Sequence, residues 1–158
     1  MKAREIIAQP LVPATRETTL DEIARLMLTH KVGCLPIVDQ QGRLCGIVTE
    51  SDFSAKEHGV PFSTLKLPQV FSKWMPQEGI ERLYDAAKKM TVGEIMTTDV
   101  IALTEDDSIE LALTLMLKHE VHRLPVVRGG VPIGIIARHD LLKLMTRQSK
   151  PDPTDLPL

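Results

Sequence analysis

Two short segments of the sequence carry side chains able to bind a phosphorylated sugar. Asp52 follows Thr49 and Ser51, and Asp140 ends a similar segment further along the chain. One carboxylate can accept hydrogen bonds from two neighbouring sugar hydroxyls, and such charge-assisted bonds contribute about 1.5 to 3 kcal/mol each. Each aspartate also lies near an expected helix start, where a carboxylate serves as a cap, so this purely structural role stays open.

A basic pair, His122-Arg123, precedes a run of apolar residues. The guanidinium of Arg123 is a planar fork suited to bidentate phosphate binding, and His122 adds positive charge below about pH 6.5. Arg138 and His139 extend this basic group. The alternative is an exposed polar pair at the start of a strand.

The chain has 158 residues, of which 19 are basic and 21 acidic, so we expect neither a nucleic-acid partner nor a membrane surface. An apolar run of about 20 residues would be needed to span a bilayer, and none occurs. The first residues contain no hydrophobic stretch of signal-peptide length. We therefore expect a cytoplasmic protein.

The chain repeats itself, which is the main clue to its architecture. When Glu5 is aligned with Glu94, residues 5–38 match residues 94–127 with about a third of the positions identical. Beyond that point a one-residue shift aligns Asp52 with Asp140. Two copies of one fold unit explain this pattern.

The same order of periodicities appears in both copies. A short strand near Leu11-Val12 or Val100-Ile101 leads to an amphipathic helix that starts after Thr19 or Ser108. Two strands follow, and a second helix begins near Ser51-Asp52 or His139-Asp140. The apolar positions of the first helices are Leu20, Ile23, Ala24, Met27 and Leu28 in one copy, and Ile109, Ala112, Leu113, Met116 and Leu117 in the other.

The doubled motif resembles the signature of cystathionine-beta-synthase-type (CBS) domains. It occurs as LPIVDQQGRLCGIVTESD and as LPVVRGGVPIGIIARHD. The resemblance implies an α+β fold of two CBS repeats, each β-α-β-β-α, packed through their sheets with pseudo-twofold symmetry. It also implies pairing of modules into a homodimer, and two clefts in which AMP, ADP, ATP or another adenosyl ligand binds.

In such a family the aspartate of one repeat faces the early strand and the residues before proline of the other repeat. The principal cleft is then expected to contain Ile47, Thr49, Ser51, Asp52, Ile101, Ala102, His122, Arg123, Leu124, Pro125, Arg138 and His139. The weaker second cleft is expected to contain Val12, Pro13, Gly33, Cys34, Leu35, Pro36, Ala137 and Asp140.

The two clefts differ in chemistry. In the second cleft Ala137 takes the place of a hydroxyl residue, and Gly33-Cys34 stand where the principal cleft has a basic pair. A phosphate would be poorly compensated there. We expect this cleft to be empty, weak, or suited to a less anionic ligand such as adenosine or S-adenosylmethionine.

The two cysteines, Cys34 and Cys45, are expected on neighbouring strands and close to opposite one another. A redox or metal role is weaker than the alternative of two reduced, half-buried thiols, because no third metal ligand lies near them in the sequence. We therefore predict no metal site.

The domain organisation follows from the repeats: repeat 1 at 1–57, a connecting segment at 58–90, repeat 2 at 91–147 and a disordered tail at 148–158. The connecting segment holds four of the five aromatic residues and a predicted helix at 80–90, so we expect it to pack on the module, across a dimer, or against a separate regulated protein.

No catalytic motif is present, so the chain is predicted not to be an enzyme and to need no catalytic cofactor. The expected function is a regulatory module that changes conformation or partner contacts when an adenine nucleotide binds. The alternative is a structural, dimerisation or partner-docking module with empty clefts. Whether magnesium accompanies the nucleotide is left open.

Overall fold

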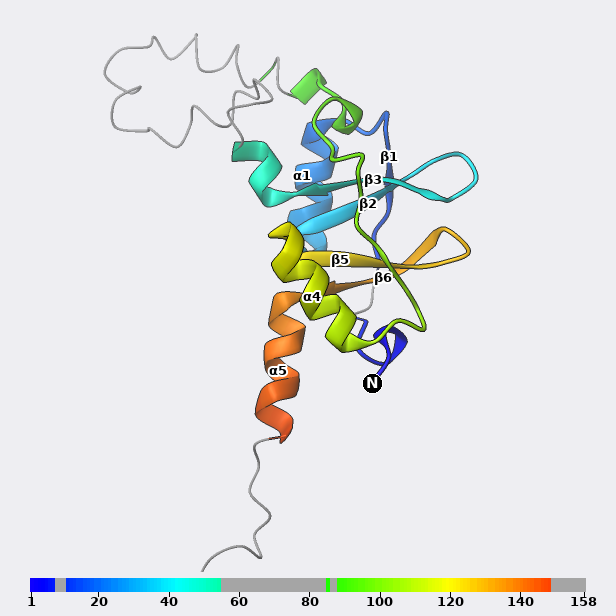
Figure 1. Cartoon of the computed structure of the whole chain (residues 1–158). Helices are drawn as coiled ribbons and strands as arrows, with labels where there is room; N and C mark the ends of the chain where they lie inside the picture. Colours follow the sequence, from blue (N-terminus) through cyan, green and yellow to red (C-terminus); the bar gives the residue numbers. More distant parts are fainter. Residues whose placement is uncertain (8–10, 55–84, 86–87, 149–158) are drawn as a thin grey trace, which may run out of the picture. The chain divides into compact units, whose positions relative to one another are not determined.

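A computed structural model describes residues 1–7, 11–54, 85 and 88–148 of the chain. The fold is α+β, as predicted: these residues form two three-stranded sheets and three α-helices (Figure 1). Each repeat supplies one sheet, in the order β1-β2-β3 or β4-β5-β6.

The first repeat forms β1 (Ala14–Thr15), α1 (Leu20–His30), β2 (Cys34–Val38), β3 (Leu44–Thr49) and η2 (Glu50–Ser54). Strand β1 runs parallel to β2, and β2 runs antiparallel to β3. The predicted order of elements is confirmed, but the described part of the closing helix is a 3-10 turn of five residues.

The second repeat forms β4 (Leu103–Thr104), α4 (Ile109–His119), β5 (Arg123–Arg128), β6 (Val131–Ala137) and α5 (Arg138–Gln148). A two-residue turn, Gly129-Gly130, joins β5 to β6. Both glycines have positive φ, 57° and 82°, which a turn of this length requires and which glycine adopts without strain. The closing element here is an 11-residue helix.

Both long helices begin and end in the same way. The hydroxyl of Thr19 accepts a hydrogen bond from the Glu22 amide, and the hydroxyl of Ser108 accepts one from the Leu111 amide, which confirms the two predicted starts. Each helix ends at a residue in the left-handed region, with φ 54° in both copies. Helices α1 and α4 therefore have the same geometry at both ends.

The first strand of each repeat was predicted three residues too early. The structure places it at Ala14–Thr15 and Leu103–Thr104, not at Leu11-Val12 and Val100-Ile101. Pairing with the second strand defines where the first strand lies, because Ala14 pairs with Ile37 and Leu103 pairs with Val126 in parallel. Apolar character alone does not reveal which residues reach a partner strand.

Not every apolar helix position faces the core. Leu20, Ile23 and Met27 of α1 are buried, and so are Ile109, Ala112 and Met116 of α4. Leu28, Leu113 and Leu117 fit the same helical spacing, but their side chains are 80%, 42% and 79% exposed. These leucines lie on the flank of the helix, one or two positions from the buried stripe.

The two compact units exchange their first segments. Of the described residues, one unit contains 1–7, 101–128 and 133–148, and the other contains 11–54, 85, 88–100 and 129–132. The start of the chain, including η1 (Ala3–Glu5), therefore belongs with the second repeat. The equivalent segment before the second repeat, including η5 (Val92–Glu94), belongs with the first. We call these the second-repeat unit and the first-repeat unit.

Matched backbone hydrogen bonds fix each exchanged segment. In the second-repeat unit the Ala3 amide donates to Asp107 O at 2.8 Å and the Arg4 amide to Glu105 O at 3.1 Å. In the first-repeat unit, Val92 donates to Thr18 O at 2.8 Å and Gly93 to Arg16 O at 3.0 Å. These pairs are related by the repeat offset, so the exchange is itself part of the repeated structure.

A glycine on the third strand of each sheet lets the exchanged segment approach. A Cβ built on Gly134 would lie 2.6 Å from Ile7 Cβ, and one built on Gly46 would lie 2.5 Å from Met96 Sδ. Ordinary van der Waals contact begins at 3.4 Å. The motif glycines are therefore required by close packing within each unit.

The two cysteines do not lie opposite one another, which corrects the prediction. Cys34 pairs with Thr49, whereas Cys45 falls at an irregularity where Ile37 pairs with Gly46 and Val38 with Leu44. Four residues of strand, about 13 Å, separate Cys45 from the partner of Cys34. A disulfide needs Cα atoms within about 7 Å. The two cysteines form no disulfide with one another; Cys34 is buried, and Cys45 is half-buried against the core.

Two predictions fall mainly outside the described residues. They are the packing of the connecting segment at 58–90 with its helix at 80–90, and the disorder of the tail at 148–158.

Candidate functional site

The carboxylate of Asp52 is held at the junction of β3 and η2. Its Oδ2 accepts hydrogen bonds from the Thr49 amide at 2.7 Å and from the Thr49 hydroxyl at 3.4 Å. The hydroxyls of Thr49 and Ser51 lie 2.7 Å apart. Among the described residues, all hydrogen bonds to this carboxylate reach Oδ2, so Oδ1 is available to accept from a ligand.

Asp140 repeats this arrangement at the junction of β6 and α5. Its Oδ2 accepts from the Ala137 amide at 3.0 Å. Both aspartates are half-buried, and each accepts from the amide of the residue that precedes its helix, three positions earlier. This is the N3 contact of a capping box, so the capping role is confirmed and a ligand role stays a prediction. Backbone geometry does not distinguish the two sites. The difference lies in the neighbours, since Ala137 has no hydroxyl and His139 replaces Ser51.

A second matched contact brings the residues before each proline beside the aspartate of the same unit. The Glu50 amide donates to Gly33 O at 3.1 Å, and the Arg138 amide donates to His122 O at 2.8 Å. The first-repeat unit therefore collects hydroxyls and a carboxylate but no basic group at these positions. The second-repeat unit collects His122, Arg123, Arg138 and His139 around Asp140.

Each predicted cleft thus takes one half from each unit. The first-repeat unit contains Ile47, Thr49, Ser51 and Asp52 of the principal cleft, with Val12, Pro13, Gly33, Cys34, Leu35 and Pro36 of the second. The second-repeat unit contains Ile101, Ala102, His122, Arg123, Leu124, Pro125, Arg138 and His139 of the principal cleft, with Ala137 and Asp140 of the second. The meeting of Asp52 with the basic pair stays a prediction.

Some predicted site residues have their side chains in the cores. Leu35 is 1% exposed and Leu124 is fully buried, each within the apolar cluster of its own unit. A ligand would meet the backbone at these positions. His122 and Arg138 are exposed, and Arg123 is half-buried, so the basic groups are accessible.

Several residues that share a cavity with Asp140 were not predicted from the sequence. A cavity of about 340 Å³ in the second-repeat unit is lined by Met1, Glu5, Ile6, Ile7, Asp140, Lys143 and Leu144. Most of these come from the exchanged segment. The repeated Glu-Ile at residues 5–6 and 94–95 was the available signal, but it was used only for alignment.

A surface ion-pair cluster distinguishes the second-repeat unit. Arg128 donates to both carboxylate oxygens of Glu105, at 2.8 and 2.5 Å, and this contact lowers the pKa of Glu105. Lys2 and Arg4 contact Asp106 at 3.0 and 2.8 Å, and the hydrogen bond from Lys2 lowers the pKa of Asp106. In the first repeat, Arg16 aligns with Glu105 and Glu17 aligns with Asp106. A positive charge therefore stands where the second repeat has the carboxylate of Glu105.

Comparison with protein families decides the classification. The model described as "CBS domain" matches residues 3–58 and 92–147, which include both aspartate junctions. The chain belongs to the CBS domain family. Its two copies form a tandem CBS pair, in agreement with the resemblance.

Several relatives contain this pair alone or as a part of a longer chain. The uncharacterized protein MJ1426 of Methanocaldococcus jannaschii is 31% identical over 156 residues, with 92% of this chain and 91% of that protein covered. The inosine-5'-monophosphate dehydrogenase of the same organism is 32% identical over 143 residues. This chain spans 23% of that enzyme and 55% of the Arabidopsis thaliana chloroplastic protein CBSX1.

Solved structures agree with the fold. The CBS domain of a membrane protein from Sphaerobacter thermophilus is 40% identical, with a TM-score of 0.75 and coverage of 90% of this chain and 86% of that one. The CBS pair of protein MJ0100, in complex with 5'-methylthioadenosine and S-adenosyl-L-methionine, is 25% identical, with a TM-score of 0.70 and coverage of 94% and 98%.

None of the helices in the described part of the chain has the length and apolar character needed to cross a bilayer. No group of three or more His, Cys, Asp or Glu side chains in the described ranges is arranged to hold a metal ion.

Proposed function

We propose that this CBS pair is a regulatory module that binds an adenine nucleotide or a related adenosyl ligand. The principal site contains Thr49, Ser51 and Asp52 of one unit with His122 and Arg123 of the other. In this role Asp52 accepts from the ribose hydroxyls, and the basic pair neutralises phosphate.

The observation that carries the proposal is the fixed carboxylate of Asp52. The Thr49 amide, 2.7 Å from Oδ2, orients the group, and Oδ1 is left by the described residues for a ligand. A carboxylate oriented before binding loses less conformational freedom when it binds. The adenosyl ligands of protein MJ0100, a CBS pair of similar fold, support the choice of ligand class.

The second cleft is proposed to prefer a less anionic adenosyl ligand. The cavity at Asp140 includes two carboxylates, of Glu5 and Asp140, and one ammonium group, of Lys143. In the second cleft, Gly33 and Cys34 stand where the principal cleft has His122 and Arg123, so the first-repeat unit brings no basic pair to neutralise a phosphate chain. Adenosine or S-adenosylmethionine is therefore expected to bind this cleft better than ATP.

The second candidate function is a dimerisation or partner-docking module with empty clefts. Helix α4 supports it, because Leu111, Leu113 and Leu117 are 39%, 42% and 79% exposed on a helix that also fills its own core. We propose that two copies associate, and that the regulated target is a separate protein or a second copy. Ligand binding can control such contacts only through different affinities for two states.

Calorimetry with AMP, ADP, ATP and S-adenosylmethionine tests the proposal. We expect one principal site, and Asp52→Ala is expected to weaken AMP binding by about tenfold or more, the value of one charge-assisted bond. Asp140→Ala, the matched substitution, is expected to change it less than about threefold. Absence of binding below about millimolar, or the reverse order of the variants, contradicts the proposal.

Two controls separate this function from others. Binding measured with and without magnesium shows whether the nucleotide binds as a metal complex. Incubation of the chain with ATP, followed by analysis for products, tests for a catalytic activity, and we expect no turnover.

A further inference from the structure

The exchanged segment of the second-repeat unit, residues 1–7, is held by ion pairs as well as by its backbone. Lys2 Nζ lies 3.0 Å from Asp106 Oδ1, and Arg4 Nη1 lies 2.8 Å from the same oxygen. Asp106 belongs to the turn between β4 and α4, and this turn also accepts the backbone hydrogen bonds of Ala3 and Arg4. One carboxylate therefore ties two cations of the segment to the turn.

The matched segment of the first-repeat unit, residues 90–96, has the same backbone contacts. Besides the two pairs of hydrogen bonds described above, the Ile109 amide donates to Met1 O at 3.2 Å in one unit, and the Leu20 amide donates to Met90 O at 2.9 Å in the other. The two segments are therefore held by the same backbone hydrogen bonds. A difference in how firmly they are held comes from side chains.

The first-repeat unit lacks the cations of this contact. Thr91 and Gly93 stand in place of the lysine and the arginine, and Glu17 stands in place of Asp106. Among the described residues, Glu17 forms no salt bridge. The acidic group is thus kept in the first repeat, but its basic partners are missing.

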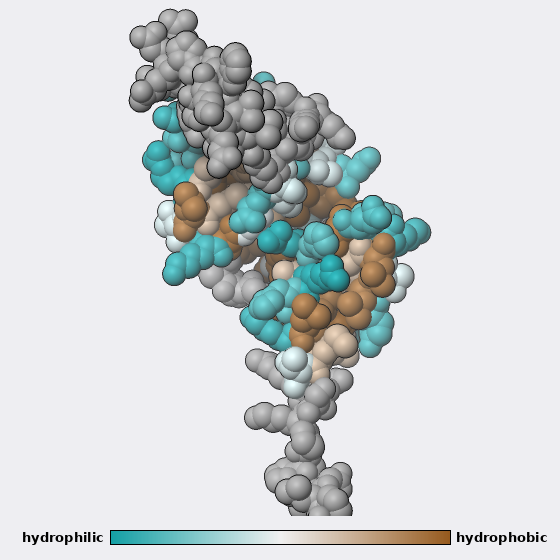
Figure 2. Space-filling model, turned by 90° about the vertical axis from the view of Figure 1, so that its left-hand side faces the viewer, coloured by the Kyte–Doolittle hydropathy of each residue, from teal (hydrophilic) through white to brown (hydrophobic). Residues whose placement is uncertain are grey.

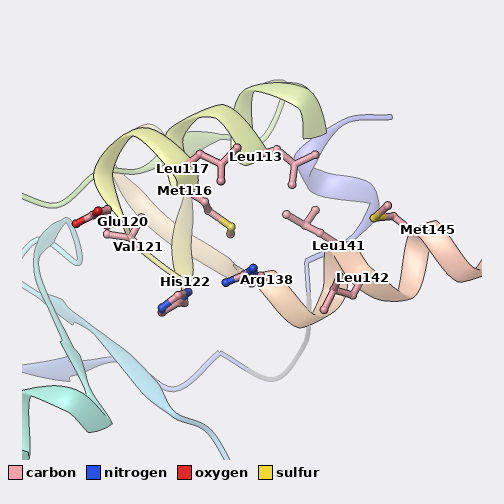
Figure 3. Close-up of a pocket in the computed structure, with 10 residues that line it drawn as sticks. All are labelled: Leu113, Met116, Leu117, Glu120, Val121, His122, Arg138, Leu141, Leu142 and Met145. Carbon is pink, nitrogen blue, oxygen red and sulfur yellow. The ribbon is translucent and has the colours of Figure 1, made fainter.

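The exchanged segment forms one wall of the cavity that contains Asp140. Its lining from the segment consists of Met1, Glu5, Ile6 and Ile7, and its lining from α5 consists of Asp140, Lys143 and Leu144. Figure 3 shows the segment, in pale blue, beside the first turn of α4 and beside α5. Met1 also lines a smaller cavity of about 180 Å³ on the side where hydrophobic residues of α4 and α5 gather (Figure 2). Without the segment, the Asp140 cavity loses one wall.

We propose that the ion pairs at Asp106 form an electrostatic latch, which keeps the exchanged segment docked as a movable wall of the Asp140 cavity. Exposed ion pairs are individually weak, but here one carboxylate binds two cations on the same segment. The side chains of Lys2 and Asp106 are 49% and 60% exposed, so salt weakens their attraction. The hydrogen bond from Lys2 also lowers the pKa of Asp106, as expected of a carboxylate stabilised in its charged form.

Amide hydrogen exchange of the full chain without ligand, measured by NMR, tests the latch. The protection factor of the Ala3 amide is expected to fall about fivefold between about 0.01 M and about 1 M sodium chloride, the effect of two screened ion pairs. The Val92 amide makes the aligned hydrogen bond and is expected to change less than about twofold. It is the internal control, because a change in global stability affects both amides. Equal changes at both amides, or no change at Ala3, overturn the proposal.

Asp106→Asn removes the latch at constant salt. At low salt this variant is expected to lower the protection factor of Ala3 about fivefold, and its remaining dependence on salt is expected to be less than about twofold. Glu17→Gln is the matched control and is expected to leave the protection of Val92 within about twofold. Both substituted residues are exposed, so neither change disturbs a core. Full protection of Ala3 in folded Asp106→Asn overturns the latch.

The consequence for the second cleft rests on the proposed function. A ligand that contacts the docked segment stabilises it, and docking favours ligand binding by the same factor. S-adenosylmethionine at about ten times its Kd is expected to raise the protection factor of Ala3 about tenfold, and Asp140→Ala is expected to abolish this gain.

The ligand experiment fails in a different way from the ligand-free ones. If calorimetry shows no binding of S-adenosylmethionine, the proposed ligand of the second cleft is wrong, and the salt dependence and Asp106→Asn still decide the latch. Binding of S-adenosylmethionine with no gain in the protection of Ala3 contradicts the role of the exchanged segment as a wall of the site.

Discussion

The two compact units have the same backbone frame but different chemistry at the equivalent site. Both hold an aspartate through a strand amide, at 2.7 Å in one unit and 3.0 Å in the other. Beside Asp52 stand two hydroxyls, whereas beside Asp140 stand an alanine and a histidine. The backbone therefore determines where a ligand can bind, and a few side chains determine which ligand binds there.

In the second-repeat unit, the closing helix α5 (Arg138–Gln148) and helix α4 together line an apolar cavity of about 490 Å³. The sequence repeat alone does not suggest this surface.

The largest expected effect concerns the glycines that admit the exchanged segments. Gly134→Ala is expected to lower the free energy of unfolding by about 3 kcal/mol, and Gly46→Ala by about 1 kcal/mol. The new Cβ would meet the branched Cβ of Ile7 in one unit but the flexible thioether of Met96 in the other. Urea unfolding of the two variants measures the difference.

The control for this comparison is a glycine without close neighbours. Gly42 has no atom within 4 Å of a built Cβ, but its φ of 77° disfavours alanine. Gly42→Ala therefore reports backbone strain without crowding, at about 1 kcal/mol. If Gly134→Ala costs no more than Gly42→Ala, then close packing of Ile7 is not what requires the glycine.

A smaller effect is expected at the ion pairs of the second-repeat unit. Arg128→Gln is expected to raise the pKa of Glu105 toward 4.5, because the hydrogen bond from Arg128 is the main cause of its lowering. With a folded-state pKa below 4.5, the carboxylate stabilises the fold above pH 4.5. This contribution is lost as the pH falls through the lowered pKa.

Carbon-detected NMR titration of the Glu105 carboxyl measures this shift. Arg43→Gln, a substitution in the turn between β2 and β3, is the control and leaves the Glu105 titration unchanged. A pKa of Glu105 that does not move in Arg128→Gln assigns the lowering to another group, of which Arg4 is the next candidate.

Much of the fold could be predicted from the sequence because it rests on local signals. The capping residues Thr19 and Ser108 and the turn Gly129-Gly130 set element boundaries through contacts with residues close in sequence. The starts of β1 and β4 could not be located, because a parallel partner more than 20 residues away fixes them. The prediction that the two cysteines lie opposite one another was wrong for a similar reason. The irregularity in the pairing of β2 with β3 has no clear signal in the sequence.

The candidate site was predicted in part. The aspartates and their hydroxyl or alanine neighbours were identified because the motif repeats, and their local contacts are matched in the two units. The cavity residues Glu5 and Ile7 were missed, because they reach Asp140 through the exchange of first segments. The apolar cavity lined by α4 and α5 was not predicted, because Leu113 and Leu117 fit the periodicity of a core helix, and periodicity does not distinguish the buried stripe from its flank.

The central claim is that the sites at Asp52 and Asp140 have the same backbone geometry but different affinities for AMP. Its most direct test is an AMP titration of the ¹⁵N-labelled chain. The Thr49 and Ala137 amides report on Asp52 and Asp140 through equivalent hydrogen bonds. The account predicts that the Thr49 signal saturates at an AMP concentration about tenfold lower than the Ala137 signal. Saturation of both signals together, or of Ala137 first, would contradict it.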